Sequence, residues 1–116
     1  LKEMAAARYR EIIHRDLDPE NRGKSHYRGP ARCIANWRRM ERFCRRERID
    51  LAGFRQEVRR ALVALLEREL ADLAGGKRGS SINCTADELY RFSRELGLAA
   101  AALPAGLGKI CPAVAE

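Results

Sequence analysis

The feature that most constrains this sequence is a stretch, residues 31–48, in which apolar and cationic side chains both recur at helical spacing. Cys33, Trp37, Met40 and Cys44 alternate steps of four and three residues, as along the seam of a helical bundle. Six arginines occupy the other positions, namely Arg32, Arg38, Arg39, Arg42, Arg45 and Arg46. A helix over these residues therefore has one apolar face and one strongly cationic face.

Two further helices follow from apolar periodicity and end signals on either side of this stretch. The first covers about 15 residues from Leu1 and stops before Pro19, because proline disfavours a helical conformation at the residue before it. Pro30 suits the first turn of the helix over 31–48. Asp50 is a candidate N-cap for another helix over 51–74, which Gly75-Gly76 ends.

A fourth helix is predicted over 86–96. Thr85 and Glu88 have the spacing of a capping box, and Gly97 is suited to close the helix. Leu and Ala dominate the composition and aromatic residues make up only 6%, which favours helices. We therefore expect an all-α fold, a small four-helix bundle over residues 1–97.

Within this bundle, we expect the helices over 31–48 and 51–74 to form the central antiparallel pair. Trp37 lies at seam spacing and is therefore predicted to be a core residue rather than a platform for base stacking. The other predicted core residues of the last two helices are Leu51, Phe54, Val58, Leu62, Leu65, Leu66, Leu70, Leu73, Leu89, Phe92 and Leu96.

The C-terminal stretch, residues 98–116, is apolar and irregular. It carries only two charged side chains, Lys109 and Glu116. Ala99–Leu103 could extend the fourth helix by about a turn, up to Pro104. Contiguous apolar surface is seldom left in water, so we expect a docking tail anchored by Leu107, Ile110 and Val114. The tail either crosses a groove of its own bundle or docks on another subunit, and the sequence slightly favours the second.

Positive charge is concentrated in residues 22–48. Ten basic and two acidic side chains give this basic segment a net charge of +8, against +7 for the whole chain. Such a footprint is typical of proteins that bind a polyanion, most commonly nucleic acid. The predicted nucleic-acid-binding residues are Arg22, Lys24, Arg28, Arg32, Arg38, Arg39, Arg42, Arg45 and Arg46.

Other chemistries find little support in the residue pattern. Gly23-Lys24-Ser25 resembles the end of a P-loop, but Asp18 stands where that fingerprint needs glycine. The two histidines and four cysteines show no metal-ligand spacing. No nucleophile, base and orienting group can be recognised together. We therefore expect no catalytic residues, no metal and no cofactor, and a protein that is not an enzyme.

The expected function is that of an accessory subunit that binds the backbone of RNA or single-stranded DNA, tolerant of sequence, in a larger nucleoprotein assembly. In size, charge and helix content the chain is similar to the small helical subunits of RNA-guided antiviral effector complexes, although it shares no motif with them. The alternative is a protein-interaction module, such as an adaptor, inhibitor or regulator, whose basic face docks on an acidic protein.

We expect two kinds of partner, namely nucleic acid and other protein subunits, the latter through the apolar face and the C-terminal tail. No membrane partner is expected, since the sequence contains neither a signal peptide nor an apolar run of membrane-spanning length. A cytoplasmic location is expected for the same reason.

Overall fold

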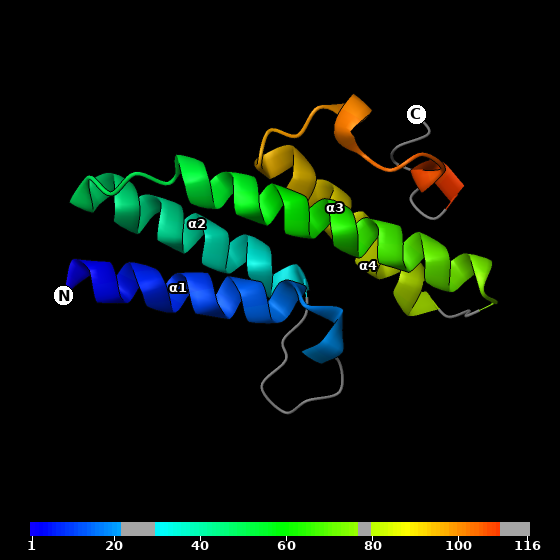
Figure 1. The fold of residues 1–116 in the computed structure, drawn as a ribbon, viewed down its shortest axis with the longest axis horizontal. Helices are drawn as coiled ribbons and strands as arrows, with labels where there is room; N and C mark the ends of the chain where they lie inside the picture. The colour runs from blue at the N-terminus through cyan, green and yellow to red at the C-terminus, as the bar shows by residue number, and fades with distance from the viewer. Residues whose placement is uncertain (22–29, 77–79, 110–116) are drawn as a thin grey trace.

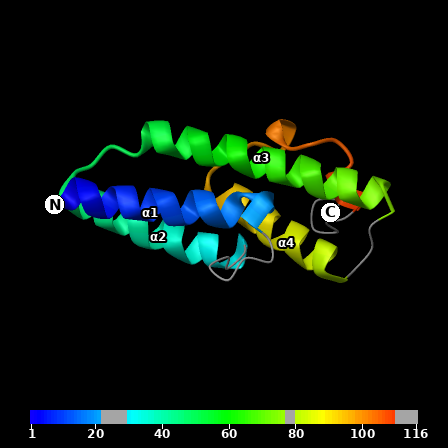
Figure 2. The ribbon, with the colours of Figure 1, turned by 60° about the horizontal axis from the view of Figure 1, so that its bottom comes forward.

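The computed structural model describes residues 1–21, 30–76 and 80–109. Four helices form a bundle: α1 (Lys2–Leu17), α2 (Pro30–Glu47), α3 (Ala52–Ala74) and α4 (Ser80–Glu95). Short 3-10 helices, η1 (Pro19–Asn21), η2 (Ala100–Ala102) and η3 (Leu107–Lys109), lie between and after them. Figures 1 and 2 show the helices running along the long axis of the molecule. The described residues contain no β-strand, and the predicted all-α bundle is confirmed.

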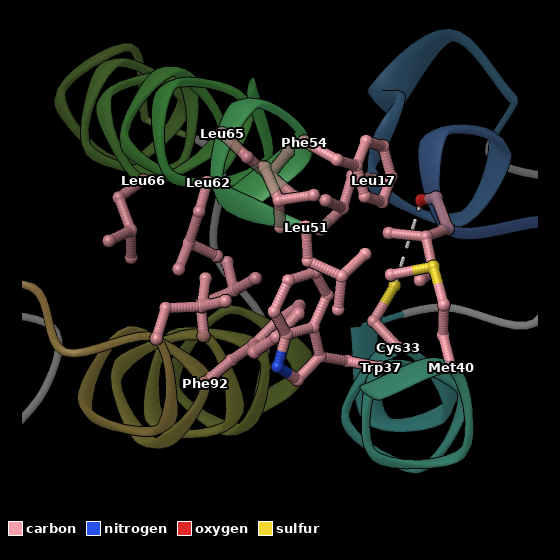
Figure 3. Packing of buried hydrophobic residues seen from close by; sticks show 14 of the residues in the cluster. Leu17, Cys33, Trp37, Met40, Leu51, Phe54, Leu62, Leu65, Leu66 and Phe92 are labelled. Carbon is pink, nitrogen blue, oxygen red and sulfur yellow. Dashed lines mark hydrogen bonds between the residues drawn. The ribbon is translucent and has the colours of Figure 1, made fainter. Parts of the chain in front are cut away.

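The order of the helices around the bundle differs from the expectation. Each helix packs against two neighbours, in the cyclic order α1, α2, α4, α3. Helices α2 and α3 run antiparallel but lie at diagonal corners of the bundle, as Figure 3 shows. The prediction that they form the central close pair is therefore wrong. A short connection between two helices does not oblige their backbones to pack when the other two helices fill the space between.

The core confirms the predicted seam of α2. Cys33, Trp37, Met40 and Cys44 are all fully buried. The Trp37 ring spans the diagonal and stacks on Phe54 of α3, with the ring centroids 6.1 Å apart, and it also contacts Phe92 of α4 at 6.4 Å. The apolar face of α2 is thus covered by the chain's own helices.

Most of the predicted core residues of α3 and α4 are buried as well. Leu70 is only partly buried, and the side chain of Leu73 lies outside the described residues. Two carboxylates, Asp16 and Glu69, are also buried in the bundle, and no periodicity in the sequence pointed to them.

The ends of the helices follow local backbone chemistry. Asp50 accepts a hydrogen bond at 3.0 Å from the backbone N–H of Ala52, the first residue of α3. Its side chain therefore serves this helix start as predicted, but the helix begins one residue later than expected and Leu51 occupies the N-cap position. Helix α4, in contrast, begins at Ser80. Thr85 therefore lies inside the helix, and the predicted capping box is wrong.

At its other end, α4 closes at Gly97 as predicted. Gly97 has a φ of +74°, and the backbone N–H of Leu98 donates to the carbonyl oxygen of Ser93 at 2.9 Å, a Schellman closure. The Arg59 guanidinium of α3 caps the same end by donating to the carbonyl oxygen of Leu96 from Nε and Nη2, at 2.9 and 2.5 Å. Helix α4 therefore does not continue through Ala99–Leu103, where η2 forms instead.

The described part of the C-terminal tail folds back on its own bundle. Residues 97–103 line pockets against both α3 and α4. Leu107 is 2% exposed and belongs to the core, and Leu103 packs against it. For Leu107 the expectation of an anchor on another subunit is therefore wrong, and the alternative, a groove of its own bundle, holds. Ile110 and Val114 lie outside the described residues.

The end of α2 gives a test of this backbone chemistry. Arg48 has a φ of +59°, a left-handed conformation that costs a residue with a Cβ about 1–2 kcal/mol. Both Arg48→Gly and Arg48→Ala remove the charge, but only glycine removes this steric cost. We expect the glycine variant to be more stable than the alanine variant by about 1 kcal/mol, measured by chemical denaturation. Equal stabilities would contradict the left-handed closure.

Candidate functional site

Five arginines form an exposed cationic strip on the outer face of α2. They are Arg32, Arg39, Arg42, Arg45 and Arg46. Burial of the seam on the opposite face sets this orientation, because residues on the two sides of a helix cannot both turn inward. Within the described part of the chain none of the five makes an ion pair, and the Arg46 guanidinium lies 5.9 Å from the Phe43 ring centroid. We call these five residues the arginine strip.

Arg38, the sixth predicted arginine of α2, differs from the others because it is already paired. Its Nε and Nη2 donate to the two carboxylate oxygens of Glu95 on α4, at 2.8 and 2.9 Å. This hydrogen bonding raises the pKa of Arg38 and lowers the pKa of Glu95. Arg38 therefore joins α2 to α4 at the edge of the strip and offers less charge to a ligand.

Arg42 is the most crowded member of the strip. Arg38 and Arg39 lie one turn before it, and Arg45 and Arg46 lie one turn after it. Like charges at these spacings destabilise a helix by about 0.2–0.5 kcal/mol per pair. Glu95 neutralises Arg38, so three uncompensated neighbours remain. The strip thus carries a repulsion that an anionic ligand would relieve.

Two further exposed arginines lie on α4, which packs against α2, and neither was among the predicted binding residues. Arg91 and Arg94 are exposed on this helix. The pattern did place Phe92 and Leu96 inward, so the outward position of these arginines was readable from the periodicity. That α4 packs beside α2 could not be predicted from the periodicity, because it depends on the packing order of the helices.

The other predicted binding residues, Arg22, Lys24 and Arg28, lie outside the described residues. Residues 1–21, 30–76 and 80–109 hold no group of three or more histidine, cysteine or acidic side chains placed to bind a metal ion. Cys33 and Cys44 are buried free thiols, and burial raises the pKa of each. No helix in the described ranges is both long enough and apolar enough to cross a bilayer.

Comparison with known proteins identifies a family. Residues 1–98 match the family described as "Repeat of unknown function (DUF7826)". The match covers the four helices, and the chain belongs to this family. No curated protein and no solved structure matches the chain significantly.

The Arg38–Glu95 pair predicts that the free energy of unfolding decreases at acidic pH. Because the pKa of Glu95 is lower in the folded chain than its ordinary value of 4.5, the pair stabilises the fold above that value and loses its contribution as the pH falls through the lowered pKa. We expect an NMR titration of the Glu95 carboxyl group to show a midpoint below 4.5.

Two variants complete this test. Between about pH 5 and about pH 3, the range in which carboxylates titrate, Glu95→Gln should lose less stability than the unaltered chain does. Glu67→Gln keeps the Arg38–Glu95 pair and is the matched control, so it should retain the acid loss. An ordinary midpoint for Glu95 would contradict the paired geometry.

Crowding around Arg42 predicts a stabilising substitution. Arg42→Gln removes three uncompensated like-charge contacts and should stabilise the ligand-free chain by about 0.5–1 kcal/mol at low salt, with a smaller gain at high salt. Arg60→Gln on α3 makes the same change of net charge where Glu57 is one turn away, and should not stabilise. Thermal denaturation at two salt concentrations measures both, and equal effects would contradict local crowding.

Proposed function

We propose that the chain binds the phosphate backbone of a nucleic acid, RNA or single-stranded DNA, through the arginine strip on α2. The observation that carries this proposal is the set of five exposed arginines, none of which is ion-paired within the described residues. Charge runs on helix faces are usually neutralised by acids one turn away. Here most of the neighbours one turn away are other arginines, and Glu41, one turn before Arg45, pairs with Arg55 of α3 at 3.2 Å. Arginine's planar fork also suits phosphate oxygens.

The dimensions of the strip are consistent with several backbone contacts. Arg32 and Arg46 are fourteen residues apart, which corresponds to about 21 Å along the helix axis. For comparison, OB folds that bind single strands cover about 4–16 nucleotides each. A strand lying along α2 would meet positive charge over this whole length.

The surroundings of the strip support binding without base-specific readout. Reading bases in a groove uses amide or hydroxyl side chains beside the arginines. Asn36 is the amide side chain of α2, and it is only 7% exposed. The strip itself therefore presents charge and little else, which favours contacts to phosphate over contacts to base edges. As part of this proposal, the chain binds the nucleic acid as one subunit of a larger assembly.

Salt dependence tests the proposal directly. If each arginine of the strip neutralises one phosphate, the logarithm of the binding constant should fall with the logarithm of salt concentration with a slope of about −3.5 for a single strand. Filter binding with single-stranded RNA, single-stranded DNA and duplex DNA at several salt concentrations measures this slope. A slope near zero for all three ligands would overturn the proposal.

Charge variants locate the contact. Arg39→Gln with Arg42→Gln should reduce the magnitude of the slope by about 1.4 and weaken binding to every sequence alike. The control is Arg8→Gln with Arg60→Gln, which removes the same charge from exposed positions on α1 and α3 and should leave the slope unchanged. If both double variants behave identically, net charge alone explains binding and the strip does not.

A second candidate is a protein-interaction unit whose cationic side docks on an acidic protein surface. The family is described as a repeat, and repeat units commonly pack on their neighbours. The side formed by α1 and α3, opposite the side formed by α2 and α4, holds a groove of about 670 Å³ with Leu17 and Leu65 among its lining residues. Asp18 and Glu67 also line it, beside His14 and Arg68. Arg68 pairs with Asp72 at 3.4 Å, so the groove offers the two carboxylates to a basic partner.

Self-association separates the two candidates. Head-to-tail contact between units predicts association at low salt that Asp18→Asn with Glu67→Gln weakens as much as Arg39→Gln with Arg42→Gln does. The nucleic-acid proposal predicts no self-association through this groove, and it predicts that the acidic variant binds a single strand as the unaltered chain does. Analytical ultracentrifugation and filter binding on the same samples decide between them.

A further inference from the structure

A small mixed pocket lies on α4, on the flank turned away from α2. Its walls are Tyr90, Ser93 and Arg94 of α4 together with residues from Gly97 to Leu103, and it encloses about 280 Å³. Glu95 faces α2 through Arg38. Tyr90 lies five residues earlier, about 140° around the helix, and therefore faces the C-terminal segment instead. We call this cavity the α4 pocket.

Tyr90 and Arg94 together give this pocket one aromatic and cationic wall. Nη1 of Arg94 donates to the Tyr90 hydroxyl at 3.3 Å, and the guanidinium carbon lies 6.0 Å from the ring centroid. The Ser93 hydroxyl donates to the backbone carbonyl of Tyr90 at 2.6 Å, so its own hydrogen-bonding need is met within the helix. Tyrosine rings and arginine planes are the side chains on which unpaired bases stack.

Exposed arginines connect the α4 pocket to the arginine strip. At 100° per residue, the charged side chains going around α4 from its α2 side are Glu88 and Glu95, then Arg91, Asp87 and Arg94, with Tyr90 next. Arg38 already neutralises Glu95 through two hydrogen bonds, so this carboxylate does not offer a free negative charge to a strand. A backbone that leaves α2 over this edge meets Arg91 and then Arg94, both exposed. Asp87, which lies between them, is partly buried and has an interaction partner of its own.

We propose that the α4 pocket receives one unpaired nucleobase of the strand that the arginine strip holds, with Tyr90 and Arg94 as its stacking wall. This inference rests on the proposed function and narrows it to single-stranded nucleic acid. In a duplex the bases are paired and stacked, and placing one in a pocket requires unpairing it. Leu98 and Leu103 also line the pocket and add apolar surface to it.

The experiment compares base-containing and base-free strands on the unaltered chain. An oligodeoxythymidylate of about ten nucleotides is tested against the same backbone in which abasic sites replace the bases. Loss of one stacked base should weaken binding by about fivefold or more, with little change in the salt slope. Equal affinities for the two strands, each with a steep salt slope, would overturn the pocket and leave the arginine strip in place.

Photocrosslinking locates the base without altering the protein. A strand carrying 5-bromouracil should crosslink at Tyr90, identified by mass spectrometry, because that ring would lie against the base. Trp37, which is fully buried, should not crosslink. Crosslinks confined to other residues would overturn the assignment. If no strand binds at any salt concentration, the proposed function itself fails, which is a distinguishable result.

Two variants complete the test. Tyr90→Phe keeps the ring and should retain most of the preference for the base-containing strand, whereas Tyr90→Leu should lose it and bind both strands alike. Arg60→Gln on α3 is the control and should keep the preference. If Tyr90→Leu has no cooperative thermal transition, the abasic comparison and the crosslink decide. A Tyr90→Leu variant that folds and keeps the full preference would overturn the pocket.

Discussion

The rest of this structure depends on the packing of Trp37 in the centre of the bundle. Its ring crosses the diagonal of the bundle from α2 to reach Phe54 of α3, and it touches Phe92 of α4 as well. Large aromatic side chains contribute more to a core of this size than any other residue type. With Trp37 held in the centre, α2 cannot rotate about its axis, and its opposite face must point to solvent. The position of the arginine strip is thus a consequence of the core.

The parts of the fold that could be predicted are those governed by periodicity along one helix. The seam of α2 and the inward residues of α3 and α4 follow from spacing alone, because burial on one face repeats every three or four residues. The order of the helices around the bundle could not be predicted in this way. It depends on which faces fit together, and each of these four helices offers an apolar stripe to two neighbours.

The same distinction applies to the candidate site. Exposure of the α2 arginines was predictable, since they lie opposite the seam. Which of these arginines is ion-paired was not predictable. Arg38 pairs with Glu95, which is 57 residues away in the sequence, and this pairing depends on the contact between α2 and α4. The early start of α4 was missed for a related reason. A capping box is a local preference of about 1 kcal/mol, and packing against the bundle can extend a helix through it.

A chain with 19 arginines among its 23 basic residues invites the explanation that composition alone places arginine everywhere. The contacts distinguish positions. On α3, Arg55 pairs with Glu41 and lies over Trp37, while Arg59 caps α4; these arginines serve the fold. Those of the strip form no ion pair and cap no helix among the described residues, and their mutual repulsion costs stability. Compositional bias would fill both kinds of position, but it gives no reason to leave five arginines together and unneutralised. A ligand that supplies the missing negative charge does, and this contrast is the physical support for the proposed binding of nucleic acid.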